Sequence, residues 1–244
     1  MKFLHLSDLH YHTDPADNVE ADTLLLSIKK KYPEHFLIIT GDITDDGSPN
    51  QYLNAGESLL PFKDRIFLVP GNHDFGAAGN FYDEERAVRF DEMLSIRFEQ
   101  GGLFAGYKPP VVNVLEDIVL IGLDSNLETL SPFDFACGEI GRQQLIELDR
   151  ILNTHKDKKK VLFLHHHLFI RDSPFMELRD ASSLARVIYG RVDVVLFGHN
   201  HKRSMWETRW GIKYIVASDN SPGKKEIGEL SVENGEVGFR YVEV

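Results

Sequence analysis

The sequence has almost no cysteine, since Cys137 alone occurs among its 244 residues. An internal disulfide and a cage of thiolate metal ligands are therefore excluded, and we interpret Cys137 as a small apolar residue. The chain also lacks any apolar run near the roughly 20 residues that span a membrane. Its start, MKFLHLSDLH, is apolar for too few residues to be a signal peptide. We therefore expect a soluble cytoplasmic protein with no membrane partner.

Positive charge is also scarce. The 27 Lys and Arg residues face 38 Asp and Glu residues, which gives a formal net charge of -11. Proteins that bind many phosphates of a duplex usually present a basic face, so this balance argues against a dedicated nucleic-acid partner. A hydrophobic content of 42% suffices for one large core. With no repeat or low-complexity linker, we expect a single domain over residues 1–244.

Short apolar strands alternate with segments of helical periodicity. We expect strands at 2–6, 36–40, 65–69, 117–123, 160–164 and 192–197, and helices at 19–31, 80–99 and 141–154. After residue 203 the pattern returns to strands, with ENGE (233–236) as a hairpin turn. The aromatic residues of 80–108 either pack this segment onto a sheet, which we favour, or form a lid. The alternation predicts an α/β layered protein, in which ligands gather at the carboxyl ends of strands.

Polar side chains of a restricted kind follow five of these strands. They are Asp8 and His10; Asp42, Asp45 and Asp46; Asn72, His73 and Asp74; His165; and His199 and His201. Each group alone has an ordinary interpretation, because an aspartate after a strand is usually a turn former. That interpretation must be repeated five times, always at a strand end, so we prefer a common site.

The residue types indicate the chemistry of that site. Carboxylates and imidazoles without thiolates suit Mn, Fe, Zn, Ni or similar divalent ions. There are more ligands than one ion needs, and two ions about 3.5–4 Å apart with a shared carboxylate form the usual clamp for displacement at phosphorus. Asp42 is the best candidate for the bridge, since it follows a buried strand and has Gly41 at its side.

In order along the chain, these residues resemble the calcineurin-like metallophosphoesterase superfamily. The resemblance rests on D-x-H (Asp8, His10), G-D (Asp42), G-N-H-D (Asn72, His73), a lone histidine (His165) and G-H-x-H (His199, His201). It implies two central mixed β-sheets flanked by helices and a pair of divalent metal ions. Asp8, His10 and His201 would hold one ion, Asn72, His165 and His199 the other, and Asp42 would bridge them. A hydroxide between the ions would be the nucleophile.

The resemblance also implies roles beside the metals. His73 would lie over the substrate phosphate, with Asn72 next to it. Asp45 would orient His73, although capping of a helix is an equal alternative for Asp45. His12 follows the first motif and is placed to line the rim of the site as a substrate contact.

The triplet of histidines at 165–167 raises a separate question, because neighbouring side chains on a strand point to opposite faces. His165 directly follows the apolar strand and takes the ligand position of the fourth motif. His166 is then a candidate substrate contact or, with His167, a supporting residue behind or beside the site. The phosphodiesterase branch often has H-H-P-P here, whereas this chain has His167 and Leu168 in place of the prolines.

The segment GDITDDGSPNQY (41–52) is similar to the branch that contains the class III cyclic nucleotide phosphodiesterases. The sequence therefore predicts a metal-dependent hydrolase of phosphodiesters in small molecules or nucleotides. A phosphomonoesterase and a nuclease of the same superfamily are the alternatives, and a non-catalytic scaffold is the least favoured. The pattern leaves the physiological substrate and the oligomeric state open.

Overall fold

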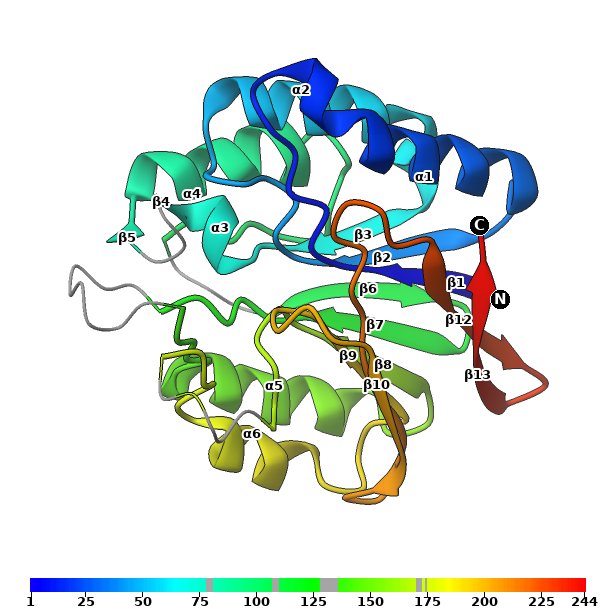
Figure 1. The fold of residues 1–244 in the computed structure, drawn as a ribbon. Coiled ribbons are helices and arrows are strands. Elements are labelled where there is room, and N and C mark those ends of the chain that lie inside the picture. Colours follow the sequence, from blue (N-terminus) through cyan, green and yellow to red (C-terminus); the bar gives the residue numbers. More distant parts are fainter. Residues whose placement is uncertain (78–80, 107–109, 128–135, 170–172, 174) are drawn as a thin grey trace.

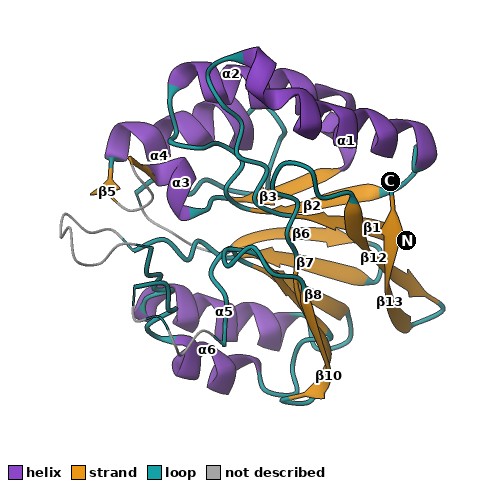
Figure 2. Cartoon of the chain, in the orientation of Figure 1, coloured by secondary structure: helices purple, strands orange, loops and turns teal. Residues whose placement is uncertain are grey.

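Two mixed β-sheets lie face to face, and helices cover their outer sides (Figures 1 and 2). The structure is a computed structural model that describes residues 1–77, 81–106, 110–127, 136–169, 173 and 175–244. The expected class, a sandwich of two mixed sheets flanked by helices, is confirmed. No helix in these described ranges is long and apolar enough to cross a membrane.

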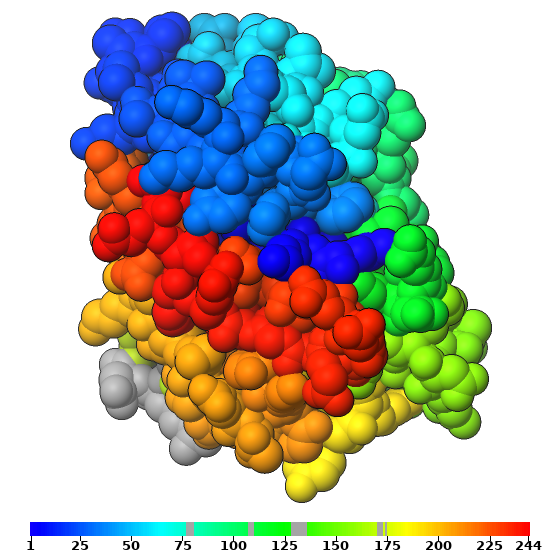
Figure 3. All heavy atoms as spheres, turned by 90° about the vertical axis from the view of Figure 1, so that its right-hand side faces the viewer, coloured from blue at the N-terminus to red at the C-terminus, as the bar shows by residue number. Residues whose placement is uncertain are grey.

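The first sheet has the strand order β13-β12-β1-β2-β3. Its strands are β1 (Lys2–Leu6), β2 (Phe36–Thr40), β3 (Ile66–Val69), β12 (Glu226–Glu233) and β13 (Glu236–Glu243). β1, β2 and β3 run parallel, while β12 and β13 form an antiparallel hairpin beside β1. Asn234 and Gly235 turn this hairpin with φ of 53° and 76°, as the predicted ENGE turn requires. In Figure 3 the carboxyl-terminal residues (red) lie between the amino-terminal part (blue) and the orange residues 204–217, which belong to the second sheet.

The second sheet has the order β10-β11-β9-β8-β7-β6. Its strands are β6 (Val111–Leu115), β7 (Ile118–Gly122), β8 (Lys159–Phe163), β9 (Val194–Phe197), β10 (Ser204–Arg209) and β11 (Ile212–Ala217). The four central strands are parallel, and both edge strands are antiparallel. Parallel strands place their carboxyl ends at one edge of a sheet, where the connecting loops gather.

Burial on both faces explains why inner strands of the second sheet, such as β7 and β9, are continuous apolar runs. Side chains of β8 alternate between two cores. Val161 and Phe163 face the core between the sheets, whereas Leu162 faces the core beneath α5 (Arg142–Thr154) and α6 (Ala181–Ile188). Leu148 of α5 and Leu184 of α6 complete this second core. The sequence predicted the strand but not which side chain faces which layer.

The outer side of the first sheet is covered by α1 (Val19–Lys31), α2 (Pro49–Leu59) and α4 (Glu84–Phe90). The short helix α3 (Asn72–Phe75) follows β3, and a two-residue hairpin pairs β4 (Gly76–Ala77) with β5 (Phe81–Tyr82). Short helical turns η1 (Pro15–Asn18) and η2 (Leu60–Arg65) extend α1 and α2. The six predicted strands and the helices at 19–31 and 141–154 agree with these bounds within two residues, while α2 and α6 lie outside the predicted helices.

The single helix predicted over 80–99 is wrong. α4 ends at Phe90, and the chain continues as a π-helical turn, η3 (Asp91–Ser95). The carboxylate of Asp91 accepts hydrogen bonds from Ser95 Oγ (2.8 Å) and from the backbone N–H of Phe104 (2.9 Å), so it ties this turn to the following loop. Phe90 and Phe98 are buried in the core of the first sheet, which supports packing rather than a lid for these two rings. Residues 80, 107 and 108 lie outside the described residues.

Candidate metal centre

Loops from both sheets meet where the parallel strands end. In the first sheet, Asp8 N–H donates to Gly41 O (3.1 Å) and His10 N–H donates to Asp42 O (3.0 Å), so the loops after β1 and β2 are joined. The second sheet reaches the same point, because His199 N–H donates to Asp8 Oδ1 (3.1 Å). The five predicted groups of polar residues therefore converge on one place between the sheets.

Three sets of side chains there have ligand atoms within 4.8 Å of one another: Asp8, His10 and His201; Asp8, Asp42 and His165; and His10, Asp42 and His73. Asp8, His10 and Asp42 each belong to two of these sets, and Asp42 is the carboxylate that shares them with both His10 and His165. Its Oδ2 is 3.2 Å from His165 Nε2 and 3.9 Å from His10 Nε2. This central position is the one that a bridging carboxylate needs.

The hydrogen bonds of the buried His165 and His199 rings indicate which ring nitrogens face the cluster, and so whether the cluster suits a cation. His165 Nδ1 donates to Thr40 O (2.7 Å), and His199 Nε2 donates to Met176 O (3.1 Å). Their other nitrogens, His165 Nε2 and His199 Nδ1, are 3.2 Å apart and face each other. In neutral rings of this tautomer both facing atoms carry lone pairs, so positive charge is needed between them, either a metal ion or a proton on His165 Nε2.

More acceptors surround the same nitrogen. Asn72 Oδ1 lies 3.2 Å from His165 Nε2, and so does Asp42 Oδ2. On the other side of Asp42, His10 Nε2 and His201 Nε2 are 3.3 Å apart. Lone pairs that converge in this way repel one another unless positive charge lies among them. The donor set, nitrogens and carboxylate oxygens without sulfur, fits divalent transition ions.

The pKa values follow the same electrostatics. Burial lowers the pKa of His199 to about 3 and that of His10 to about 4, so both rings are neutral, as metal ligands must be. Burial also opposes a charge on His165, but the nearby carboxylates of Asp42 and Asp8 outweigh it and raise the pKa of His165 to about 9. The centre of the cluster therefore attracts positive charge.

The backbone around these residues is strained. Asp8, His10, Asp42, His199 and His201 have φ of 61°, 48°, 49°, 80° and 50°. Non-glycine residues rarely adopt this left-handed conformation, which costs about 1–3 kcal/mol and concentrates at functional sites. Five of the seven predicted ligands thus have a backbone conformation that is unfavourable for a non-glycine residue and that the surrounding fold maintains.

Two glycines allow the close approach of the loops. A Cβ on Gly71 would overlap the backbone nitrogen of Asp42 and lie 2.9 Å from its Cγ. A Cβ on Gly198 would overlap Ser7 Oγ and lie 2.6 Å from Asp8 Oδ2. A side chain at either position would push the loops of the centre apart, which explains the glycine before each motif.

His73 and Asp45 are in contact, but not as the spacing suggested. His73 Nδ1 donates to the main-chain O of Asp45 (2.6 Å). The Asp45 carboxylate instead lies 3.7 Å from His10 Nδ1 and 3.7 Å from His12 Nδ1. Burial opposes a charge on His73, yet Asp42 and the Asp45 carbonyl raise its pKa above the ordinary value. Helix α2 is preceded by Ser48, whose N–H donates to Asp46, so Asp45 is not its cap.

Asp74 braces the loops from behind. Its buried carboxylate accepts from Thr44 N (2.8 Å), Thr44 Oγ1 (2.8 Å), Ile43 N (3.2 Å) and Gly71 N (2.9 Å). These four bonds join the loop that carries Asp42 to the loop that carries Asn72 and His73.

The other two histidines of the triplet do not reach the cluster of ligand atoms. His166 is 0% exposed; its Nδ1 pairs with Ser125 Oγ (2.8 Å), and its ring lies 4.4 Å from the ring of His199. Direct contact of His166 with a substrate therefore has no support in this geometry, and a supporting position behind the ligands does. His167 packs on Phe197 (4.8 Å) and accepts from Phe169 N–H. His12, by contrast, is partly exposed at the rim beside Asp45.

The sequence interpretation missed a sixth strand end. After β11 come Ser218, Asp219 and Asn220, all buried. Asn220 N–H donates to Ser7 O (2.9 Å), and Lys224 Nζ donates to His201 O (3.3 Å). The signal was present, since KYIVA followed by SDNS repeats the pattern of an apolar run and then polar residues. The pattern of the residues after 203 predicts strands, and it does not by itself indicate that the polar residues 218–221 reach the metal centre.

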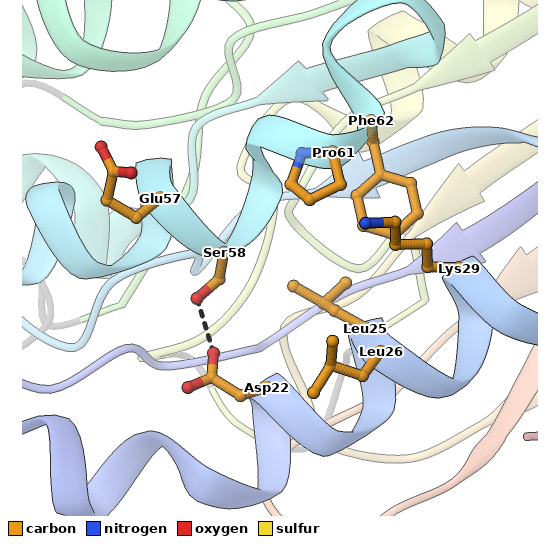
Figure 4. A pocket seen from close by; sticks show the side chains of 8 residues that line it. All are labelled: Asp22, Leu25, Leu26, Lys29, Glu57, Ser58, Pro61 and Phe62. Carbon is orange, nitrogen blue, oxygen red and sulfur yellow. Dashed lines mark hydrogen bonds between the residues drawn. The ribbon is translucent and has the colours of Figure 1, made fainter.

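A separate apolar groove lies between α1 and the end of α2 together with η2 (Figure 4). It is lined by Asp22, Leu25, Leu26, Lys29, Glu57, Ser58, Pro61 and Phe62. Asp22 accepts from Ser58 Oγ (2.6 Å) and from Tyr11 OH (2.9 Å). The lining contains no histidine, so the groove does not offer the ligands of the centre described above.

Known proteins resemble this chain in sequence. Residues 1–203 match the calcineurin-like phosphoesterase family. The 3′,5′-cyclic adenosine monophosphate phosphodiesterase CpdA of Haemophilus influenzae is 24% identical over 265 residues, which cover 100% of this chain and 85% of that protein. A probable glycerophosphodiester phosphodiesterase, GpdQ of Arcobacter nitrofigilis, is 30% identical over 209 residues, which cover 81% of this chain and 67% of that protein.

Solved structures share the fold. A dimetal phosphatase from Danio rerio has a TM-score of 0.73 at 14% identity and covers 99% of this chain and 95% of its own. GAP50, the anchor in the inner membrane complex of Plasmodium, has a TM-score of 0.60 at 13% identity, with 100% of this chain and 84% of its own covered. The resemblance that the motifs suggested is confirmed by the family match. The chain belongs to the calcineurin-like phosphoesterase family and is a metal-dependent phosphoester hydrolase.

Proposed function

We propose that this protein is a two-metal phosphodiesterase, with residues 1–244 as its one domain, that cleaves phosphodiesters of small molecules or nucleotides. The observation that carries the proposal is the pair of facing ring nitrogens of His165 and His199, 3.2 Å apart beside the Asp42 carboxylate, with the opposite nitrogen of each ring bound to a main-chain carbonyl. A buried arrangement of this kind is costly unless cations lie within it.

The ligand sets are those that the family resemblance implies, and short distances between their members support them. Asp8, His10 and His201 would hold one ion, and Asn72, His165 and His199 would hold the other. Asp42 would bridge the two, since its carboxylate faces both His10 and His165. Mn, Fe, Zn and Ni all suit these ligands. Two such ions would neutralise phosphate oxygens and make a hydroxide nucleophile available near neutral pH.

His73 is our candidate for the general acid. Its Nδ1 proton is held by the Asp45 carbonyl, so the proton that it can give to a leaving oxygen is the one on Nε2. Both nitrogens carry protons only in the charged ring. The raised pKa of His73, to which Asp42 and Asp45 contribute against the effect of burial, favours that form. Asp45 therefore positions His73 through its carbonyl, while Asn72 and His12 are placed beside the substrate.

The preference for diesters is supported by the names of two relatives, the cyclic AMP phosphodiesterase CpdA and the probable glycerophosphodiester phosphodiesterase GpdQ. The fold alone does not distinguish diesters from monoesters, because the similar Danio rerio protein is described as a dimetal phosphatase. The net charge of -11 favours small substrates over a nucleic-acid duplex.

The test compares bis-p-nitrophenyl phosphate with p-nitrophenyl phosphate on protein first stripped with chelator and then given Mn, Fe, Zn, Ni or Mg. Cyclic nucleotides, glycerophosphodiesters and single-stranded DNA form a second panel. We expect activity to return with a transition ion and kcat/KM to be higher for the diester. A higher kcat/KM for the monoester would make the protein a phosphomonoesterase, and preferential cleavage of DNA would make it a nuclease. Full activity of the stripped protein would contradict the metal centre.

A further inference from the structure

The segment 218–224, between β11 and β12, ties the two sheets together at the metal centre. Ser218 N–H donates to Phe197 O (2.8 Å) in the second sheet, and Ser218 Oγ donates to His5 O (3.3 Å) in the first. Asn220 exchanges two bonds with the backbone of Ser7, donating its N–H to Ser7 O (2.9 Å) and accepting from Ser7 N–H with Oδ1 (3.3 Å). The segment is therefore fixed next to Asp8.

One lysine of this segment reaches a predicted ligand. Lys224 Nζ donates to the main-chain O of His201 (3.3 Å) and pairs with the carboxylate of Asp219. The Asp219 side chain is only 3% exposed, and its Oδ1 also accepts from Ser221 Oγ (2.7 Å). Asp219 is therefore a fixed anchor that holds the flexible lysine side chain against the His201 carbonyl.

His201 needs such support more than the other histidine ligands do. Its side chain is 44% exposed, whereas the side chains of His10 and His165 are 9% and 0% exposed and His199 is buried. Packing therefore cannot fix its ring to the degree that it fixes the other three. Its backbone has φ of 50°, a conformation that a histidine leaves unless its surroundings hold it there. Within the described residues, Lys224 is the one side chain with a hydrogen bond to the His201 carbonyl.

We propose that Lys224, anchored by Asp219, is a positioning residue that sets the affinity of the ion held by Asp8, His10 and His201. This inference rests on the proposed function, since it takes His201 as a metal ligand. The second ion, held by Asn72, His165 and His199, has no contact with Lys224 through these bonds. Groups that orient metal ligands typically change metal affinity by about 10–100-fold when they are removed.

The experiment measures Mn²⁺ binding to chelator-stripped protein by calorimetry and by the Mn²⁺ paramagnetic resonance signal. In Lys224→Met we expect one of the two Kd values to rise by roughly 10-fold or more and the other to stay within about 2-fold. Asp219→Asn should weaken the same site, because the lysine loses its anchor. Lys224→Arg should recover most of the affinity. Activity should then return at higher Mn²⁺ with a kcat near that of the wild type.

The neighbouring Lys225 supplies the matched control. It is exposed and directly follows the segment 218–224, and in the described structure no bond joins its side chain to His201. Lys225→Met removes the same charge and should leave both Kd values unchanged. Equal weakening by both lysine variants would reduce the effect to net charge and overturn the inference, as would unchanged binding in Lys224→Met.

His201→Ala separates this inference from the proposed function. If His201→Ala loses one ion but Lys224→Met binds normally, only the positioning role fails. If His201→Ala binds two ions as tightly as the wild type, the ligand assignment itself fails, and the positioning role fails with it.

Discussion

His165 Nε2 and His199 Nδ1 face each other across 3.2 Å, and the opposite nitrogen of each ring donates to a main-chain carbonyl. The carbonyls of Thr40 and Met176 thus fix which nitrogen of each ring faces the other, and His165 Nε2 also lies 3.2 Å from Asp42 Oδ2. A carbonyl behind a metal-binding histidine is a common device, because it fixes the ring and makes the facing nitrogen more basic. The backbone, more than the identity of the side chains, orients this centre.

The histidine triplet offers a first prediction. His165→Ala should lower the metal content and abolish most activity, since it removes a ligand beside the bridging carboxylate. His167→Ala should keep both metals, because the His167 ring contacts Phe197 and Trp206 instead. Elemental analysis of protein purified without chelator measures the result, with up to two transition ions per chain expected for the wild type. Metal loss in His167→Ala alone would show that the wrong histidine is assigned.

The bridge gives a second prediction. Asp42→Ala removes a ligand from both proposed ions and the negative charge that reduces their repulsion. We expect the variant to lose most of its metal and its activity together. Asp46→Ala, four residues along the same loop, is the control, since Asp46 contacts Ser48 rather than the cluster. Two tightly bound ions in Asp42→Ala would contradict the bridging role.

The third prediction concerns His73. His73→Ala should lower kcat by about 10²–10⁴-fold and leave the metal content near that of the wild type, because general acid help is of this size. The loss should be large for an alkoxide leaving group and small for p-nitrophenolate, which departs without a proton. Equal losses for both would mean that His73 only stabilises charge. Loss of metal would make it a ligand. His155→Ala, at the end of α5, is the control.

Features that depend on consecutive residues could be predicted from the sequence, whereas features that depend on contacts between distant residues could not. Six strands and the five ligand-bearing loops were predictable, because apolar runs and the residues that follow them are read from consecutive positions, whereas β6 was not predicted. The role of the Asp45 carbonyl was not, since every residue has a carbonyl and only the folded chain shows which one meets His73 Nδ1. The sixth loop was missed for a similar reason: Asn220 meets Ser7 across 213 positions.

The break after Phe90 shows a different limit. Residues 84–99 have helical periodicity, but the Asp91 carboxylate also satisfies the backbone N–H groups of Phe104 and Ala105. The turn at Asp91 is widened, since Ile96 N–H donates to Asp91 O (2.8 Å). This widened turn carries the carboxylate that binds the loop at residues 104–105. Periodicity describes which face of a helix is apolar, but it does not record a buried carboxylate that serves another loop.

A fourth prediction follows from Asp74. Asp74→Asn replaces one acceptor oxygen by an NH₂ group, so at least one of the four donors around it loses its partner and one N–H faces another. Hydrogen bonds to charged groups are worth about 1.5–3 kcal/mol each, so we expect a loss of roughly 2–4 kcal/mol and a Tm lower by roughly 5–15 °C. Asp46→Asn, which affects one bond near the surface, should change Tm little. Thermal unfolding with chelator present measures both.

The last prediction concerns pH and His5, a buried residue of β1. Its Nε2 pairs with Thr40 Oγ1 (3.0 Å), and burial lowers its pKa to about 3. In the unfolded chain the ordinary pKa is about 6.5, so below that pH the unfolded state binds a proton that the folded state refuses. Stability from this residue is therefore complete above pH 6.5 and is lost as the pH falls toward 3.

The size of this effect follows from the shift. For a pKa of about 3 against about 6.5, the folded state should lose about 2 kcal/mol between pH 7 and pH 5 through His5 alone. His5→Gln keeps a polar group that can meet Thr40 but does not titrate. We expect urea unfolding of the wild type, with chelator present, to show the steeper decline, so that the variant gains about 2 kcal/mol relative to the wild type over this range. Parallel curves for the two proteins would mean that the buried ring accepts a proton at its ordinary pKa, and the first sheet would then have to admit a charge beside Thr40.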